Sequence, residues 1–257
     1  MTSLHRVLPR ILLLLMTAYV LFCTGLFLFQ RSMIYFPQPR AIQAPQSTLL
    51  LPVAEGKLII TVRPTTGRKA IIYFGGNAED VSVNLPEFAQ AFPEHALYLL
   101  HYPGYGGSAG APSEQAIAQD ALALFDRVHA EHPEIAIIGR SLGTGVAVRL
   151  ASQRPASRLI LITPYDSLQE IAAAQFPYVP VRWLLRDTYD SGHYAPSITI
   201  PTTLIAAGDD RLIPAASTKR LFTRFGKGVA SLRVIPATDH YNISASRDYL
   251  PAIEAGL

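Results

Sequence analysis

The sequence predicts a doubly wound α/β domain with a mostly parallel sheet, preceded by one membrane-spanning helix. Two observations support this prediction. Residues 11–29 form an uncharged apolar run, ILLLLMTAYVLFCTGLFLF, close to the ~20 residues that cross a bilayer as a helix. The rest of the chain alternates short, almost continuously apolar runs with longer amphipathic stretches. That alternation is typical of buried parallel strands joined by helices.

Length and composition set the limits of the domain. The 257 residues suffice for one domain, which we expect at 37–257, after an anchor at 1–36. The net charge is +3 and the basic residues are scattered, which argues against nucleic-acid binding. Cys23 is the single cysteine, so an intrachain disulfide is excluded and a Cys/His metal site is not expected.

The N-terminal apolar run is typical of an uncleaved signal anchor. It is longer than the core of a secretory signal, and no small-residue cleavage site follows it. Arg6 and Arg10 precede the run, and Arg31 and Arg40 follow it. This small bias favours an N-terminus in the cytoplasm. We therefore expect a single-pass protein whose folded domain lies outside, in the periplasm if the source is a Gram-negative bacterium.

Short apolar runs predict seven strands, and helical spacing of apolar residues predicts the helices between them. The strands are expected at Lys57–Arg63, Ala70–Phe74, Leu97–Tyr102, Ile135–Gly139, Leu159–Ile162, Thr202–Ala207 and Leu232–Ile235. The helices are expected at Glu114–Glu131, Leu142–Gln153 and Ala215–Phe225.

Residues 164–197 interrupt the alternation of strands and helices. The segment is rich in proline and aromatic residues and stands between two predicted strands. A long insertion at strand ends is a candidate lid over a site, which we expect to be short and helical. The alternative is a packed surface excursion without a gating role. Phe176 and Trp183 are the apolar lid residues that we expect to contact a lipid-like substrate.

Residues 139–143 read GRSLG, a G-x-S-x-G motif. The run EIAIIGR predicts a strand before the serine, and SLGTGVAVRLASQ predicts a helix after it. Ser141 therefore stands at the sharp strand-to-helix turn that exposes a nucleophile. The alternative is a serine that only caps a helix, and the flanking glycines disfavour it. The sequence predicts Ser141 as the nucleophile of a serine hydrolase.

A serine nucleophile needs a base and an acid that orients the base. In this arrangement the chain order is Ser, then Asp or Glu, then His. His240 follows the last predicted strand and is favoured over His193, which lies in the insertion. Asp210 is the preferred acid because it follows a predicted strand, with Asp209 as its close rival and Asp166 as a third option.

Backbone N–H groups near the serine are expected to form an oxyanion hole. One comes from Leu142, directly after the nucleophile, and the other from Asn77, after an early strand. The glycines in FGGNAED allow close backbone approach, so we also expect Gly76 to lie against the substrate.

With these residues in place, the chain resembles the membrane-anchored α/β-hydrolase-domain proteins, near the palmitoyl-protein thioesterases and the bacterial serine aminopeptidase-like proteins. The resemblance implies the α/β-hydrolase fold and assigns Ser141, Asp210 and His240 to the triad. The group spans esterases, thioesterases, lipases and peptidases, so the resemblance leaves the substrate open. Four motifs carry it: GGNAED at 75–80, HYPGYGGSAGAPSE at 101–114, GRSLGTG at 139–145 and GDDRLIP at 208–214.

These features predict hydrolysis of a carboxylic ester or thioester through an acyl-enzyme on Ser141, without metal or cofactor. The expected substrate is a small or acylated molecule. One alternative is a peptidase or aminopeptidase with the same triad. An alternative of another class is a membrane-anchored binding scaffold without catalysis, which the presence of all three triad side chains disfavours.

Overall fold

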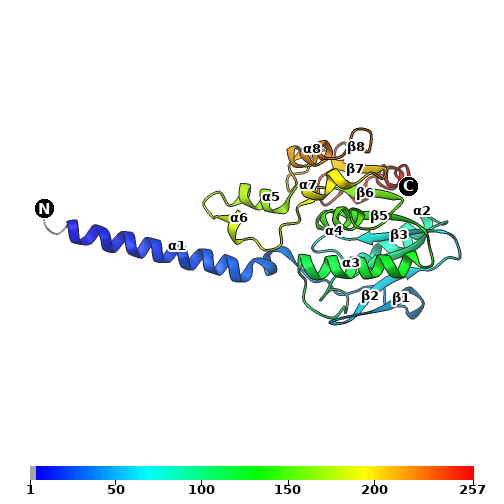
Figure 1. Cartoon of the computed structure of the whole chain (residues 1–257), viewed down its shortest axis with the longest axis horizontal. Helices are drawn as coiled ribbons and strands as arrows, with labels where there is room; N and C mark the ends of the chain where they lie inside the picture. The colour runs from blue at the N-terminus through cyan, green and yellow to red at the C-terminus, as the bar shows by residue number, and fades with distance from the viewer. Residues whose placement is uncertain (1–3) are drawn as a thin grey trace.

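The computed structural model describes residues 4–257, and a long N-terminal helix projects from its α/β domain (Figure 1). This helix, α1 (Leu4–Ile34), has 31 residues. Residues 7–34 have a mean hydropathy of 2.4 in their most apolar window and are long and apolar enough to cross a membrane. From Val7 to Phe22 its apolar side chains are largely exposed. Residues 1–3 of the predicted anchor lie outside the described residues.

One sheet of eight strands organises the domain, in the order β1-β2-β4-β3-β5-β6-β7-β8. β1 pairs antiparallel with β2, and β2 pairs antiparallel with β4, while every other pair is parallel. The predicted mostly parallel sheet is confirmed. The strands are β1 (Thr48–Val53), β2 (Gly56–Arg63), β3 (Lys69–Phe74), β4 (Ala96–Leu100), β5 (Glu134–Arg140), β6 (Arg158–Ile162), β7 (Thr202–Ala207) and β8 (Ala230–Ile235).

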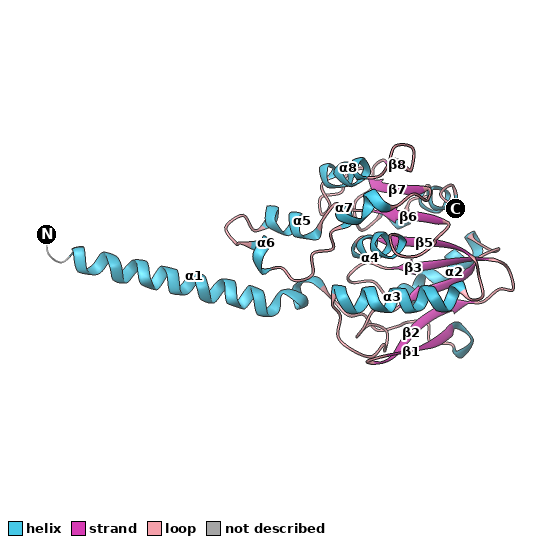
Figure 2. Cartoon of the chain, viewed as in Figure 1, coloured by secondary structure: helices cyan, strands magenta, loops and turns pink. Residues whose placement is uncertain are grey.

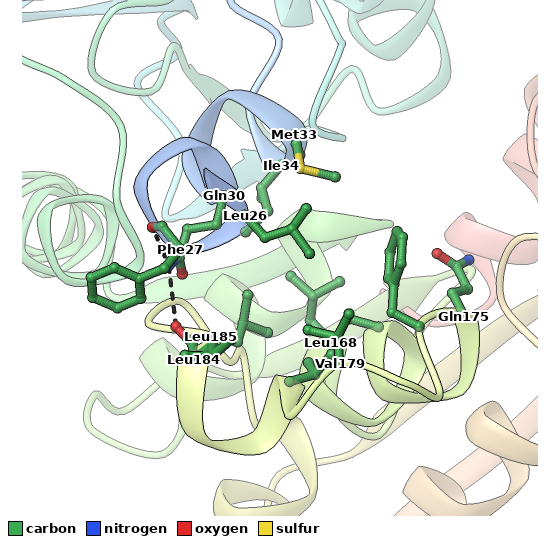
Figure 3. A pocket seen from close by; sticks show the side chains of 13 residues that line it. Leu26, Phe27, Gln30, Met33, Ile34, Leu168, Gln175, Val179, Leu184 and Leu185 are labelled. Carbon is green, nitrogen blue, oxygen red and sulfur yellow. Dashed lines mark hydrogen bonds between the residues drawn. The ribbon is translucent and has the colours of Figure 1, made fainter. Parts of the chain in front are cut away.

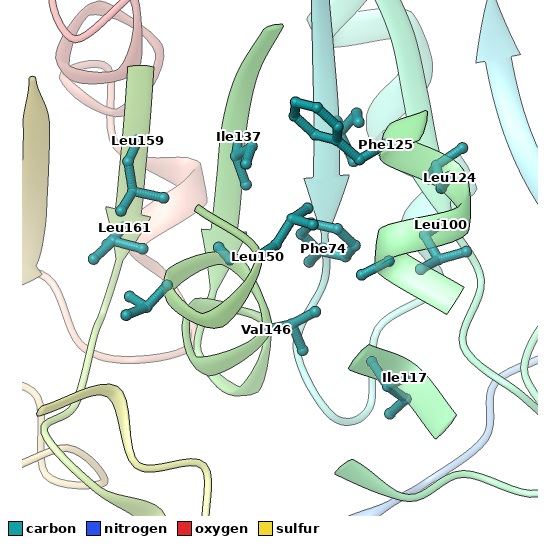
Figure 4. Close-up of a cluster of buried hydrophobic side chains, with 14 of the residues drawn as sticks. Phe74, Leu100, Ile117, Leu124, Phe125, Ile137, Val146, Leu150, Leu159 and Leu161 are labelled. Carbon is teal, nitrogen blue, oxygen red and sulfur yellow. The ribbon is translucent and has the colours of Figure 1, made fainter. Parts of the chain in front are cut away.

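Helices cover both faces of the sheet (Figure 2). α3 (Glu114–His129), α4 (Leu142–Ala151) and α8 (Ala215–Arg224) lie on one face, and α2 (Leu85–Ala91) and α9 (Tyr249–Glu254) lie on the other. Each face of the sheet has its own hydrophobic core, and successive side chains along a strand point into one core and then the other. Ile137 of β5 packs toward α3 and α4 (Figure 4), whereas its neighbour Ile138 belongs to the opposite core. Burial on both faces explains why these strands appear as continuous apolar runs.

The insertion between β6 and β7 contains α5 (Leu168–Gln175), α6 (Val181–Leu184) and α7 (Ser191–Tyr194). α5 and α6 project from the domain along the C-terminal part of α1 (Figure 1). We call residues 168–185 the lid hairpin. Three elements were not anticipated from the sequence: β1, α2 and α9.

The end of α1 is joined to the domain by polar contacts at the base of the lid hairpin. Arg31 Nε donates to Asp187 Oδ2 at 3.0 Å. The Tyr35 hydroxyl lies 3.1 Å from the same carboxylate oxygen and 2.8 Å from the Tyr189 hydroxyl. Burial holds the pKa of Tyr35 well above its usual value, so the hydroxyl keeps its proton. These contacts fix the direction in which α1 leaves the domain.

Candidate active site

Ser141 lies in the tight turn between β5 and α4. Its backbone adopts φ 50° and ψ −118°, a conformation that is strained for a residue with a side chain. The turn needs glycines two positions before and two positions after the serine. A Cβ on Gly143 would collide with the Phe74 carbonyl, and one on Gly139 would collide with Gly143. The close contact of α4 with β3 and β5 therefore holds the serine side chain outward.

A chain of hydrogen bonds joins Ser141 to two side chains from the same sheet edge. Ser141 Oγ lies 2.8 Å from His240 Nε2, and His240 Nδ1 lies 2.9 Å from Asp210 Oδ2. His240 follows β8 and Asp210 follows β7. Their side chains expose only 8% and 7% of their surface. Parallel strands end at one edge of the sheet. Ser141 and Asp210 therefore meet His240 there, although they are 99 and 30 residues away from it in the chain.

Asp210 is itself held in place by the backbone. Its Oδ1 accepts the N–H groups of Leu212 and Ile213 at 2.9 and 2.8 Å. The remaining oxygen, Oδ2, points to His240. These bonds fix the carboxylate in one orientation, so the imidazole of His240 is held in line with Ser141.

The two other acids considered from the sequence lie elsewhere. The Asp209 side chain is exposed, and its backbone N–H donates to the Thr238 carbonyl at 2.8 Å. Asp166 is buried, with carboxylate oxygens 3.8 Å from Arg220 and 3.7 Å from Arg224 of α8. Asp210 is therefore the acid of the three that contacts His240.

The loop after β3 lies directly against the nucleophile. A Cβ placed on Gly76 would stand 3.7 Å from Ser141 Cβ. Within the described part of the chain, the backbone N–H groups of Asn77 and Leu142 form no hydrogen bond. Asn77 also connects this loop to the anchor, because its Nδ2 donates to the Ile34 carbonyl at 2.9 Å.

Glu79 fixes this loop and was missed in the sequence analysis. Its Oε2 accepts the Gly76 N–H at 2.7 Å, and its Oε1 accepts the Tyr73 hydroxyl and Asn84 Nδ2, both at 2.7 Å. Arg140 Nη1 lies 3.6 Å from Oε2. The local signal was an acid three residues after the second glycine of the turn. Its role depends on how the loop folds back onto that glycine.

A pocket of about 250 Å³ lies between the C-terminal part of α1 and the lid hairpin (Figure 3). Phe176 is one of its lining residues. Trp183 does not line it, and this side chain is 88% exposed. The lining residues are Leu26, Phe27, Gln30, Met33, Ile34, Leu168, Ala172, Gln175, Phe176, Val179, Val181, Leu184 and Leu185.

This geometry can support nucleophilic acyl transfer. A hydroxyl contacts a histidine, the histidine contacts a fixed carboxylate, and the loop after β3 lies against the serine.

Comparison with known proteins gives the family. No protein-family model matches the chain. An uncharacterised protein of Mycobacterium tuberculosis is 37% identical over 210 residues, which cover 75% of this chain and 74% of that protein. The lysophosphatidylserine lipase ABHD12 of Xenopus tropicalis is 30% identical over 182 residues, which cover 62% of this chain and 47% of the lipase.

A solved structure shows the same fold. MGS-M2, an α/β-hydrolase enzyme from a deep-sea metagenome library, superposes with a TM-score of 0.67 at 16% identity, covering 81% of this chain and 96% of that one. The fold and the relatives together indicate a hydrolase. The chain belongs to the α/β-hydrolase superfamily.

Proposed function

We propose that the protein is a serine hydrolase that cleaves a carboxylic ester or thioester through an acyl-enzyme on Ser141. The observation that carries the proposal is the hydrogen-bond chain from Ser141 Oγ through His240 to Asp210. His240 Nε2 accepts the Ser141 proton as Oγ attacks the carbonyl carbon. The N–H groups of Asn77 and Leu142 stabilise the resulting oxyanion. Asp210 orients the imidazole and stabilises its charged form.

The second half of the reaction uses the same groups. The tetrahedral intermediate collapses, and protonated His240 gives its proton to the leaving alcohol or thiol. Water then attacks the acyl-enzyme, and His240 accepts a proton from that water. The carboxylic acid leaves and Ser141 regains its proton, so the enzyme returns to its starting state.

Two observations support a lipid-like or acylated substrate. The pocket beside the site is lined by side chains without charge. The relative at 30% identity is named a lysophosphatidylserine lipase. An acyl ester is therefore the substrate class that we test first.

The test compares three bond types in the purified full-length protein. We expect hydrolysis of p-nitrophenyl acyl esters or acyl thioesters, and its loss in Ser141→Ala. Faster cleavage of aminoacyl amides than of either ester class would instead favour the peptidase alternative. Absence of turnover on all three, by a folded protein, would favour the binding scaffold.

We also propose that α1 anchors the protein in a membrane with its N-terminus in the cytoplasm and the hydrolase domain outside. The apolar character of residues 7–34 supports the anchor, and the basic residues before the apolar run support the orientation. Fusing a reporter that is active only outside the cytoplasm to the C-terminus tests this. Activity only of a cytoplasmic reporter at that position would reverse the orientation.

A further inference from the structure

We propose that the pocket between α1 and the lid hairpin binds the acyl chain of a membrane lipid ester, which enters the pocket from the bilayer itself. The inference rests on the proposed ester hydrolysis, and it names the substrate class and the entry route. Four features carry it: the lining of the pocket, its connection through Ile34 and Asn77 to the loop that lies against Ser141, the point along α1 that the lid hairpin reaches, and the composition of the hairpin tip.

The lining suits an apolar ligand. None of the pocket residues carries a charge. The buried amide of Gln30 is already used, because its Nε2 donates to the carbonyls of Phe27 and Leu184 at 2.7 and 3.1 Å. Its Oε1 accepts the Arg186 N–H at 2.7 Å. Gln175 is the other polar side chain of the lining, and it is exposed. A pocket lined mainly by apolar side chains, with its buried amide already hydrogen-bonded, favours a hydrocarbon chain over a polar ligand.

Both walls of the pocket begin at the edge of the sheet where the nucleophile lies. On one side, Ile34 lines the pocket and its carbonyl accepts a hydrogen bond from Asn77. Asn77 follows Gly76, which is packed against Ser141. On the other side, Leu168 lines the pocket and opens α5, the first helix after β6. An acyl chain in the pocket would therefore reach toward Ser141 with its ester end.

The lid hairpin reaches to the level of the membrane along α1. Arg31 is the first charge after the apolar run and marks the level of the lipid headgroups. The Tyr178 carbonyl accepts a hydrogen bond of 2.8 Å from the Tyr19 hydroxyl. Tyr19 is twelve residues before Arg31, about 18 Å along a helix. With a hydrocarbon core ~30 Å thick, the tip of the hairpin would lie within that core beside α1.

The backbone of the hairpin tip is adapted to a lipid environment. Unpaired backbone N–H and C=O groups are costly in hydrocarbon. Pro177 and Pro180 have no N–H group. The Val179 N–H donates to the Phe176 carbonyl at 3.0 Å, and the Tyr178 carbonyl is paired with α1 as described above. The loop therefore presents few polar groups to lipid.

The side chains of the hairpin change character at its base. Residues 171–181 read IAAAQFPYVPV and contain no charge. Immediately outside them, Arg182 Nη2 donates to Glu170 Oε2 at 2.9 Å. Trp183, which follows Arg182, exposes 88% of its surface. Such aromatic residues are enriched where a membrane meets water. This arrangement opens the pocket toward the bilayer rather than toward water.

The first test fills the pocket in the full-length protein reconstituted in phospholipid nanodiscs. Ala172→Phe adds bulk from α5, and Met33→Trp adds bulk from α1. We expect each to lower the ratio of kcat/KM for p-nitrophenyl laurate to kcat/KM for p-nitrophenyl acetate roughly tenfold. The matched control is Ala174→Phe, an exposed position on the same helix that does not line the pocket; it should affect neither ester. Undiminished laurate hydrolysis, or equal losses on both esters in both variants, would overturn the proposal.

A second test is independent of catalysis. Ser141→Ala in vesicles would be crosslinked to a lysophospholipid that carries a diazirine in its acyl chain, and the crosslinked peptides mapped by mass spectrometry. We expect crosslinks in residues 26–34 and 168–185 that decrease with added Ala172→Phe. Crosslinks confined to residues 7–22 would overturn the acyl pocket, even if the wild type hydrolyses esters. Crosslinks in the pocket without wild-type hydrolysis would retain the pocket and reject the proposed function.

Discussion

At the scale of single residues, the carboxylate that orients His240 can be tested against its neighbour in the chain. Asp210→Asn would place an amide against His240 Nδ1 and disfavour the tautomer that accepts the Ser141 proton. We expect kcat to fall by roughly 10³–10⁴, measured by steady-state hydrolysis of p-nitrophenyl acetate. Asp209→Asn, which changes an exposed side chain, is the matched control. Its kcat should stay within about twofold of the wild-type value. A large loss in the control alone would transfer the role to Asp209.

Glu79 is expected to act as a positioning residue for the oxyanion loop. The two carboxylate oxygens of Glu79 together accept three hydrogen bonds. In Glu79→Gln an amide nitrogen, which can only donate, replaces one of these oxygens. We expect kcat to fall roughly tenfold to a hundredfold, with KM almost unchanged, because the N–H donors move relative to the oxyanion. Thermal unfolding of the same samples separates this effect from loss of the fold. An unchanged kcat would show that the loop does not need Glu79.

The residues of the candidate site differ in how visible they were in the sequence. The glycines around Ser141 are required by a local turn, so a short motif predicted its place. The choice of Asp210 among three acids was left open, because all three follow strand ends and only the folded loop brings one to His240. Glu79 lies within the GGNAED motif, but that motif assigned it no role. Its function comes from the loop folding back so that one carboxylate meets Tyr73, Gly76 and Asn84 together.

At the scale of elements, the lid hairpin offers a direct optical test, because Trp183 is the single tryptophan of the chain. If the hairpin lies in the bilayer, brominated phospholipids in vesicles should quench its fluorescence strongly. Acrylamide, added from water, should quench less in vesicles than after unfolding in denaturant. Trp183→Phe is the control for background signal. Acrylamide quenching in vesicles as strong as in the unfolded chain, without quenching by brominated lipid, would place the hairpin in water.

The sequence predicted the central strands of the sheet better than the edge strand β1 and the insertion between β6 and β7. Strands buried on both faces have a strong apolar signal, as in β5 and β6. β1 is an edge strand paired only with β2, and it contains Pro52 and follows a proline-rich stretch. The turn to β2 lacks the Asn-Gly or Asp-Gly signature of a hairpin. The helices of the insertion have only 8, 4 and 4 residues, too few for the spacing of apolar residues to define their bounds.

At the scale of the whole molecule, a buried carboxyl group should limit stability at neutral pH. Asp120 of α3 is 8% exposed, and burial, with a smaller effect of Glu55, raises its pKa to about 6. In the unfolded chain it titrates near ~3.9. The folded state therefore binds the proton more tightly, and the free energy of unfolding decreases as pH rises from about 4 through 6.

We expect Asp120→Asn to remove this penalty. At pH 8 the variant should have a free energy of unfolding higher by about 2 kcal/mol, which corresponds to a Tm higher by roughly 5 °C. At pH 3.5 its stability should differ little from that of the wild type. Thermal unfolding in detergent at the two pH values measures this. Asp126→Asn in the same helix is the control: it removes an exposed ion pair with Arg154 and should not stabilise the protein. Equal Tm shifts of Asp120→Asn at both pH values would contradict the account.

The joint between anchor and domain is the whole-molecule feature that the sequence could not reveal. An apolar run at one end and an α/β pattern in the rest suggested two separate parts. The structure joins them through Arg31 and Asp187, which are 156 residues apart, and through Asn77 at the end of α1. Such contacts depend on the tertiary fold, so neither composition nor periodicity predicts them.

The central claim is that Ser141 is an activated nucleophile, and a fluorophosphonate probe tests it most directly. Wild-type protein and Ser141→Ala, both shown to be folded, would be incubated with the probe and the modified peptide identified by mass spectrometry. We expect labelling of the wild type on Ser141 and none in the variant. Labelling that persists in Ser141→Ala, or its absence from folded wild type, would contradict the account.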